Sequence, residues 1–165
     1  MHPLHLEKPA NLNLAWQWRV DQLNEAADIS VRTGEDIALK VCTMWDEPIE
    51  RMPFVDRQAL RFLRSRTEDP VPGATVCYIW DAHLPVGTQA NSPFTGRLRY
   101  IVLRSGPERL HRWTPERRDI VADFLKLFGD ESREVPPLIG VAVGADADNT
   151  RGHSLAHAAD LVLAP

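Results

Sequence analysis

Apolar and polar residues alternate most clearly between residues 12 and 20. One side of this stretch carries five large apolar residues, Leu12, Leu14, Trp16, Trp18 and Val20, and smaller or polar residues stand between them. A period of two is typical of a strand that buries one face. The pattern therefore predicts a half-buried strand whose two tryptophans point into a core, with an exposed sugar-stacking platform as the alternative.

Further strands are predicted where alternation or an unbroken apolar run lies between proline, glycine and asparagine. These segments are 35–46, 74–80, 98–104, 138–143 and 155–163, and the short segment 110–113 is a candidate extra edge strand. Between 81 and 97, prolines, glycines and an asparagine indicate a long ordered loop. Many alternating strands and few helices favour a mainly antiparallel β-sandwich with one or two flanking helices.

Two helices are predicted beside these strands. The clearer one covers 115–128, with Thr114 as its N-cap, Pro115 at its first position and an apolar face that packs against the sheet. Residues 55–66 are weakly helical, with an apolar stripe and four arginines outside it. A basic helix can contact anionic partners, but such a run of charges is more often a solvated face, and we interpret it so.

Length, composition and charge set limits on this fold. A chain of 165 residues with 44% hydrophobic and 25% charged residues has the size and composition of one globular domain. We assign residues 1–11 to an N-terminal tail, or a fragment of a sheet edge, and 12–165 to a single domain. The net charge is −4 and the 19 basic residues are scattered, which argues against nucleic-acid binding. The sequence shows neither a transmembrane run nor a secretory signal.

Three residues on predicted strands need burial or a partner. Cys42 and Cys77 lie mid-strand in apolar surroundings and are interpreted as buried thiols, with a cross-strand disulfide as the alternative. Lys40 shares a strand face with Asp36, which is its predicted ion-pair partner.

The loop after the 138–143 strand carries the closest group of carboxylates. Asp146, Asp148 and Asn149 supply hard oxygen atoms, for which Ca²⁺ is the first metal to consider. Arg151 and His157 stand where an EF-hand loop would have its glycine and its final acid. A turn held by its own side chains is therefore favoured, and a structural Ca²⁺ is the single cofactor hypothesis.

Polar strand faces, strand ends and the ordered loop supply the candidate ligand-binding residues, which are Trp80, Asp81, Asn91, Arg99 and Asp160. Asp81 and His83 also form a pair that can perform acid–base chemistry when a nucleophile lies within reach. The sequence has no GxSxG elbow, no HExxH motif and no P-loop, so a catalytic role for this pair is only the alternative hypothesis.

Taken together, several segments resemble the bacterial domain-of-unknown-function family DUF3047. The resemblance lies in the runs YIWDAHLPVGTQANSPFTGRLRYIVLRSG, RWTPERRDIVADFLKLFG, IGVAVGADADNT and AADLVL, and it covers about residues 12–163. The matching motif positions are Tyr78, Trp80, Pro85, Gly87, Thr88, Pro93, Thr95, Arg104, Ser105, Gly106, Trp113, Glu116, Arg117, Arg118, Asp123, Phe128, Gly129, Asp146, Asp148, Asn149, Thr150 and Asp160.

This resemblance implies a jelly-roll sandwich similar to galactose-binding-like carbohydrate-binding modules, in an exported or periplasmic protein, and it implies no established activity. Relatives usually carry a leader and further strands before the 12–20 strand. We therefore expect a domain that lacks its first strands and leaves a sheet edge open to a second copy. The tyrosine usual near Asp160 is replaced by Ala158 or Ala159.

The leading hypothesis is a non-catalytic domain that binds a carbohydrate or a similar polar ligand. One alternative is a hydrolase or lyase that uses Asp81 and His83 with the acidic loop, and another is a structural or assembly domain of an envelope protein. An exposed aromatic ring beside polar groups would favour the first. A cleft shared by Asp81, His83 and Asp146 would favour the second, and an open sheet edge without either would favour the third.

Overall fold

The computed structural model describes residues 2–7, 10–67 and 70–165, and in them it contains nine strands and three helical segments. The strands are β1 His2–Leu6, β2 Asn13–Gln22, β3 Leu39–Trp45, β4 Ala74–Asp81, β5 Gln89–Asn91, β6 Leu98–Ser105, β7 Thr114–Asp119, β8 Leu138–Gly144 and β9 Leu155–Ala164. The helical segments are the 3-10 turn η1 Ile49–Arg51 and the helices α1 Phe54–Arg64 and α2 Ile120–Phe128.

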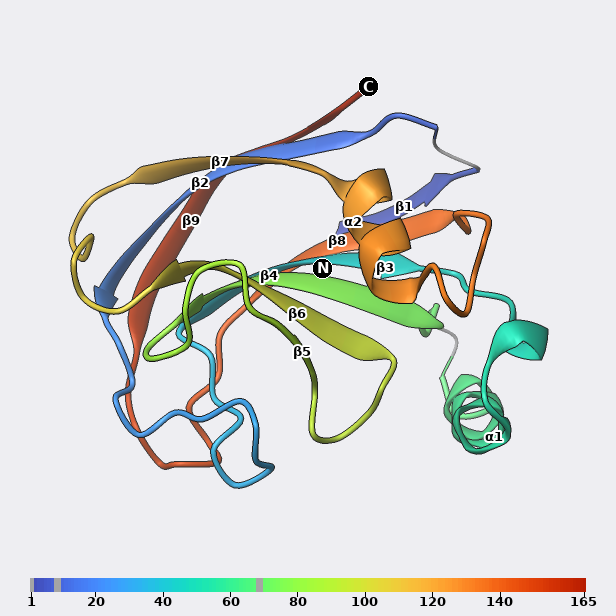
Figure 1. Cartoon of the computed structure of the whole chain (residues 1–165), viewed down its shortest axis with the longest axis horizontal. Helices are drawn as coiled ribbons and strands as arrows, with labels where there is room; N and C mark the ends of the chain where they lie inside the picture. The colour runs from blue at the N-terminus through green and yellow to red at the C-terminus, as the bar shows by residue number, and fades with distance from the viewer. Residues whose placement is uncertain (1, 8–9, 68–69) are drawn as a thin grey trace.

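These strands form two sheets that face each other (Figure 1). The larger sheet has the order β1-β8-β3-β4-β6-β5, and the smaller has the order β7-β2-β9. Every neighbouring pair is antiparallel except β4 and β6, which are parallel. The prediction of a mainly β, sandwich-like fold with flanking helices is confirmed. The parallel pair arises because the long connection after β4 returns to the end of the sheet where β4 began.

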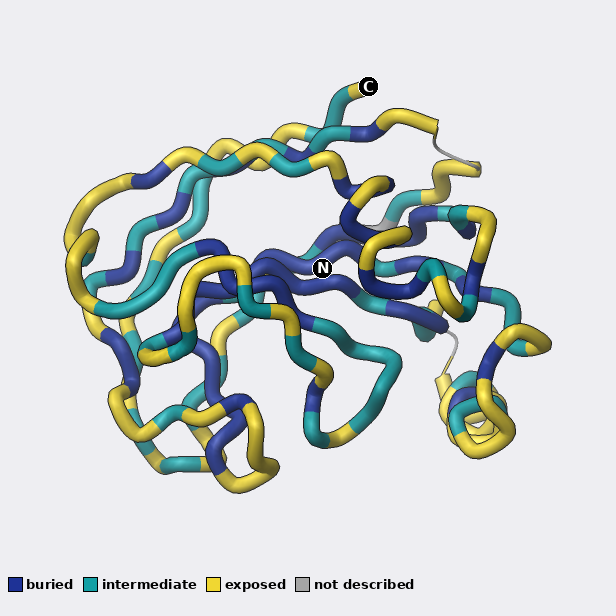
Figure 2. The backbone as a smooth tube through the Cα atoms, viewed as in Figure 1, coloured by how far each residue is buried: buried dark blue, intermediate teal, exposed yellow. Residues whose placement is uncertain are grey.

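The two sheets are joined by aromatic side chains. Trp16 of β2 packs on Tyr78 of β4 with ring centroids 5.3 Å apart, and Trp18 packs on Trp80 at 5.9 Å. Both β2 tryptophans are almost completely buried, at 2% and 0% exposure, so the predicted half-buried strand is confirmed and a stacking platform made of these two rings is wrong. Figure 2 shows the buried residues concentrated on the facing strands.

The helix predicted over 115–128 begins later than the sequence suggests. Residues 114–119 form β7, which pairs with β2, because that pairing supplies the backbone hydrogen bonds that a first helical turn would leave open. Asp119 is the N-cap, and its side chain accepts from the N–H groups of Val121 and Ala122 at 3.1 and 2.9 Å. Thr114 is therefore not the cap. The candidate edge strand at 110–113 is also wrong, since that segment is a turn.

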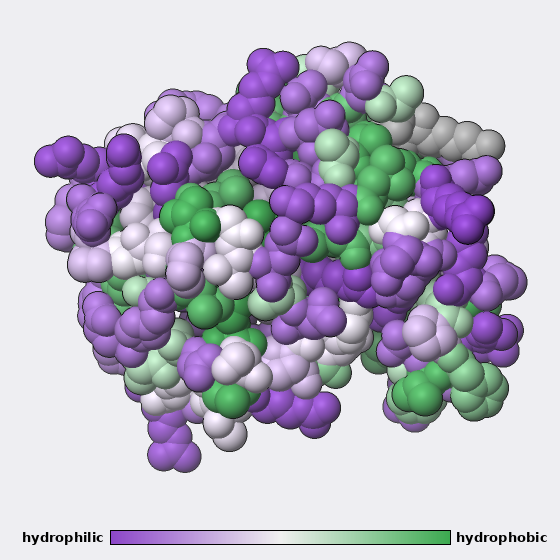
Figure 3. Space-filling view, in the orientation of Figure 1, coloured by the Kyte–Doolittle hydropathy of each residue, from purple (hydrophilic) through white to green (hydrophobic). Residues whose placement is uncertain are grey.

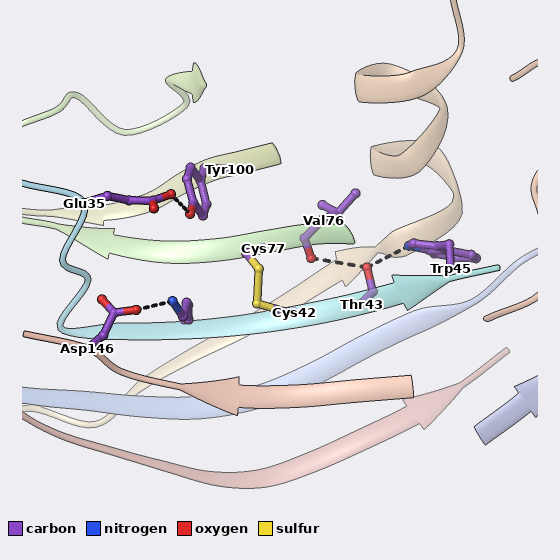
Figure 4. The surroundings of a disulfide bond; sticks show 9 residues. Glu35, Cys42, Thr43, Trp45, Val76, Cys77, Tyr100 and Asp146 are labelled. Atoms are coloured by element: carbon purple, nitrogen blue, oxygen red, sulfur yellow. Dashed lines mark hydrogen bonds and ion pairs between the residues drawn. A yellow bond between two sulfur atoms is a disulfide. The ribbon is translucent and has the colours of Figure 1, made fainter. Parts of the chain in front are cut away.

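Cys42 and Cys77 are directly opposite in the β3–β4 register and form a disulfide (Figure 4). The interpretation as free thiols is therefore wrong, and the cross-strand alternative holds. The bond lies in a second, smaller core on the other face of the larger sheet, with Ile79, Tyr100 and Val102 among its members.

The ends of the larger sheet hold the remaining elements. The initial segment, assigned to a tail or an edge fragment, includes β1, which pairs with β8. At another corner, α1 confirms the helix predicted near 55–66, although it buries only Leu60. Among the described residues, no helix is both long and apolar enough to cross a bilayer.

Candidate binding site

The outer face of the smaller sheet is polar because alternate residues of β2 point away from the core. Gln17, Arg19 and Asp21 occupy these positions and are partly exposed. His157 of β9 lies beside Arg19, since the two residues are paired in register. The alternation that buries the tryptophans therefore gathers charged groups and a histidine on the opposite face.

Asp21 is the centre of this polar cluster. Its Oδ1 accepts a hydrogen bond from Arg19 Nε at 2.6 Å and lies 3.1 Å from His111 Nδ1, while its Oδ2 lies 3.2 Å from His157 Nε2. The hydrogen bond from Arg19 holds the pKa of Asp21 below its usual range, although partial burial acts in the opposite direction. Asp21 is therefore a carboxylate that orients three basic side chains.

An exposed tryptophan borders the cluster. Trp113 lies in the connection between β6 and β7, which curves round one end of the molecule in Figure 1. The residue is 46% exposed. Its ring centroid is 6.3 Å from that of His157. His111, in the same connection, has a left-handed backbone (φ 63°) and donates its N–H to the carbonyl of Val20 at 2.9 Å. This bond holds the turn, and with it Trp113, against the end of β2.

The polar face continues along β9. Gln17 Nε2 donates to Asp160 Oδ2 at 2.9 Å, and Asp160 also has a left-handed backbone, with φ 54°. This conformation coincides with a register shift between Ala15 and Gln17 in the β2–β9 pairing. Asp160 is thus a predicted ligand-binding residue that the structure places on the same outer face as Trp113.

The other predicted ligand-binding residues lie elsewhere, and Trp80 and Arg99 are already engaged. Trp80 is 1% exposed and donates its Nε1–H to the carbonyl of Gly106, so a ligand on the surface cannot reach its ring. Asn91 is exposed on β5, on the larger sheet. Arg99 donates to Glu131 and stacks over Phe128 at 4.0 Å, where it ties β6 to the end of α2. The structure does not bring the five residues together.

Asp81 and His83 border an open cavity of about 530 Å³ that residues 25–30 also line. Asp81 is 8% exposed, and its Oδ1 accepts two backbone N–H groups, those of His83 and Leu84, at 2.7 and 2.6 Å. His83 Nε2 lies 2.9 Å from the carbonyl oxygen of Glu25. The carboxylate therefore caps a turn and contacts the backbone of residue 83, and no ion pair joins it to the imidazole among the described residues.

Comparison with known proteins adds one result to this geometry. A family model described as a protein of unknown function, DUF3047, matches residues 1–162. The chain belongs to the DUF3047 family. No curated protein and no solved structure matches it. The resemblance inferred from the sequence motifs is therefore confirmed, and the family description adds no activity.

Several DUF3047 motif positions form polar links between the two sheets. Glu116 of β7 accepts from Arg104 of β6 at 2.5 Å and from Trp18 Nε1 at 3.1 Å. Nearby, Asp123 of α2 is held by Arg118 at 2.6 and 2.8 Å. These links explain why the motif pairs acidic and basic residues at a short spacing, and they hold the end of β7 in place.

The acidic loop of the DUF3047 motif is also bound to the body. Asp146 accepts from the N–H of Ile37 at 2.8 Å and from Lys40 Nζ at 2.5 Å, so the predicted Lys40–Asp36 pair is wrong. Asp148 is exposed. No group of three or more His, Cys, Asp or Glu residues in the described part of the chain could hold a metal ion.

Asp36 instead organises the turn that follows. Its carboxylate is 1% exposed and accepts from the N–H groups of Asn149 and Thr150, at 3.1 and 2.8 Å, and from Asn24 at 3.2 Å. Burial acts to raise the pKa of Asp36, but the hydrogen bonds from Thr150 and Asn149 hold it below the usual range. The side-chain amide of Asn149, a predicted metal ligand, donates a hydrogen bond to the carbonyl of Glu35. The segment is thus a hydrogen-bonded turn, but the prediction that its own side chains hold it is wrong, because Asp36 of a distant segment accepts the hydrogen bonds.

The cluster around Asp21 could not be selected from the sequence. Its members lie on three segments, and His111 and His157 are 90 and more residues from Asp21 along the chain. Trp113 is a DUF3047 motif position, but the candidate edge strand at 110–113 gives no reason to expect an exposed ring there. Only the β2–β9 register and the turn at His111 bring these groups together.

Proposed function

We propose that this chain is a non-catalytic domain that binds a carbohydrate or a similar polar ligand on the outer face of the smaller sheet. The observation that carries the proposal is the exposed ring of Trp113 beside His157 and the Arg19–Asp21 pair. An exposed aromatic ring next to fixed polar groups is the arrangement that distinguishes this hypothesis from its alternatives.

The chemistry of the cluster matches that of a sugar. A pyranose ring presents an apolar C–H face that can stack on an indole, which is large, rigid and loses little rotamer freedom on binding. Its hydroxyl groups both donate and accept hydrogen bonds. The Asp21 carboxylate accepts, and the Arg19 guanidinium donates in a planar geometry. Asp160 and Gln17, further along the face, provide contacts for a second sugar unit.

The expected jelly-roll likeness to carbohydrate-binding modules belongs to the same proposal. So does an exported location, which the disulfide supports, because such bonds persist mainly in oxidising compartments. The hydrolase or lyase alternative has weaker support, since Asp81 caps a turn and Asp146 is paired with Lys40 in a different network.

The proposal is tested by a thermal-shift screen of the full chain against millimolar mono- and oligosaccharides. A ligand that binds only the folded state stabilises it by about 2.7 kcal/mol at one hundred times its dissociation constant, so a binding sugar raises the melting temperature. Trp113→Ala should abolish the shift, whereas Phe94→Ala, which removes another exposed ring (51%), should retain it. A screen with no shift in any sugar class, or a shift that survives Trp113→Ala, would overturn the proposal.

A further inference from the structure

The apolar side of α1 faces solvent. Phe54, Val55, Phe62 and Leu63 are 69%, 76%, 57% and 52% exposed, whereas Leu60 is the one buried residue of the helix. In the space-filling view, their green surface forms a cluster at the lower right corner, over α1 (Figure 3). A patch of this kind on a globular protein usually marks a surface that contacts something else.

The orientation of α1 is fixed by its arginines. Arg64 donates to Asp46 at 2.6 Å and to the carbonyl of Val71 at 2.9 Å, and Arg57 donates to the carbonyl of Met52 at 3.1 Å. The polar side that would normally face water is thus turned towards the body of the protein. The sequence interpretation of these arginines as a solvated face is wrong for two of the four, and the apolar stripe is the side left outside.

The exposed stripe has a basic border. Arg61 is exposed, and its side chain makes no hydrogen bond or ion pair with the described residues. The guanidinium of Arg66 lies 4.5 Å from the centre of the Phe62 ring. Between residues 56 and 66 the chain has four arginines and one aspartate, although its overall net charge is −4. Arg57 and Arg64 face the body, so Arg61 and Arg66 are the two positive charges that border the apolar stripe.

We propose that α1 binds the surface of a bilayer that contains anionic lipids. The apolar side chains insert into the boundary between headgroups and acyl chains, and Arg61 and Arg66 contact lipid phosphates. A short helix with phenylalanine and leucine on one side and arginine beside them has the composition of helices that lie in this interface. Anionic lipid headgroups attract each nearby arginine. The position of α1 at a corner of the molecule leaves its stripe free to approach a flat surface (Figure 1).

The charge of the helix argues against a second copy as the occupant. A twofold contact between two α1 stripes would bring Arg61 and Arg66 of both copies to one interface, where like charges repel. The stripe spans three turns only, so the expected binding is weak and reversible. The proposal depends on residues other than those of the sugar-binding face and does not rest on that function.

The experiment is co-sedimentation of the full chain with vesicles of phosphatidylcholine alone and of phosphatidylcholine with one third phosphatidylglycerol. We expect binding to the anionic vesicles only, and a loss of binding at high salt because exposed charges are screened. Phe62→Ser with Leu63→Ser, and separately Arg61→Glu with Arg66→Glu, should each weaken binding at least about tenfold. Phe94→Ser changes a ring of similar exposure elsewhere, 51% against 57% for Phe62, and this variant should bind like the unmodified chain.

Because all four substituted residues are exposed, the variants should keep the melting temperature of the unmodified chain, and this is checked first. Absence of binding to the anionic vesicles would overturn the proposal, as would equal binding by the Phe62→Ser, Leu63→Ser variant. A concentration-dependent dimer in analytical ultracentrifugation that disappears in this variant, without vesicle binding, would assign the stripe to a second copy instead.

Discussion

Arg118→Met should destabilise the fold more than the same substitution at Arg117, the other arginine of β7. The Arg118 guanidinium makes two hydrogen bonds with the carboxylate of Asp123, at 2.8 and 2.6 Å, and Tyr78 donates its hydroxyl to the same carboxylate at 2.9 Å. These three residues come from β7, α2 and β4, so the carboxylate joins both sheets and the helix. Burial, and then the charge of Asp123, raise the pKa of Tyr78, so its phenol keeps the proton that it donates.

The size of the effect follows from burial. The side chain of Asp123 is 6% exposed, and that of Arg118 is 33% exposed. Removing one partner of a buried ion pair costs about 3–5 kcal/mol, because the other charge stays buried without compensation. Water reaches the outer part of Arg118 and screens the pair, which places the expected loss in the free energy of unfolding at about 2–3 kcal/mol.

Urea unfolding followed by tryptophan fluorescence measures this loss, since Trp16, Trp18, Trp45 and Trp80 are all buried. Arg117→Met is the matched control: the neighbouring arginine is exposed and makes one long contact, 3.4 Å, with Asn13, so it should change stability by less than about 0.5 kcal/mol. The triple variant Arg118→Met, Asp123→Leu, Tyr78→Phe should be more stable than Arg118→Met alone, because neither a charge nor an unpaired hydroxyl remains buried. Equal losses in Arg118→Met and Arg117→Met would refute the reasoning.

Two further predictions concern the larger sheet. Replacing Cys42 and Cys77 by alanine opens a link across a sequence separation of 35 residues and should lower the free energy of unfolding by up to about 4 kcal/mol; an unchanged urea midpoint would contradict the bond. Glu47 is 2% exposed, its carboxylate oxygens have no hydrogen-bond partner among the described residues, and burial raises its pKa above 4.5. Because the pKa of Glu47 is higher in the folded state, the free energy of unfolding falls as the pH rises through that pKa. Glu47→Gln should therefore raise the free energy of unfolding by roughly 1 kcal/mol at pH 7, and by less below pH 4.5. Equal stability of this variant and the unmodified chain at pH 7 would contradict that assignment.

The sequence predicts where the strands of this protein lie better than it predicts what each segment pairs with. The alternation in β2 is a local signal, and burial follows it residue by residue. The β7 segment shows the limit of such signals. Thr114 and Pro115 are good starting residues for a helix, but the open edge of β2 offers hydrogen bonds that local preference cannot anticipate. Asp119, five residues later, then supplies the cap.

Partners that lie far apart in the sequence could not be chosen for the same reason. The sequence predicts Asp36 as the partner of Lys40 because both lie on one face of a predicted strand. The actual partner, Asp146, is 106 residues away and is brought close by the β3–β8 pairing. The candidate site has the same character. Neither Asp21 nor any of the basic residues that it contacts stands at a motif position. The β2–β9 register and the left-handed turn at His111 bring these residues together.

The disulfide encloses the whole excursion that carries α1. The chain leaves the larger sheet after Trp45 and returns to it at Ala74. Cys42 and Cys77 lie within β3 and β4, just before the chain leaves the sheet and just after it returns. A protease that cuts between them would produce two pieces still joined through sulfur, which would separate on a gel only after reduction. The excursion is therefore a closed side loop. Tension applied to α1 would reach the sheet first at the paired residues Trp45 and Ala74, both of which are buried in the core. The disulfide, three residues further along each strand, would then limit how far β3 and β4 can separate.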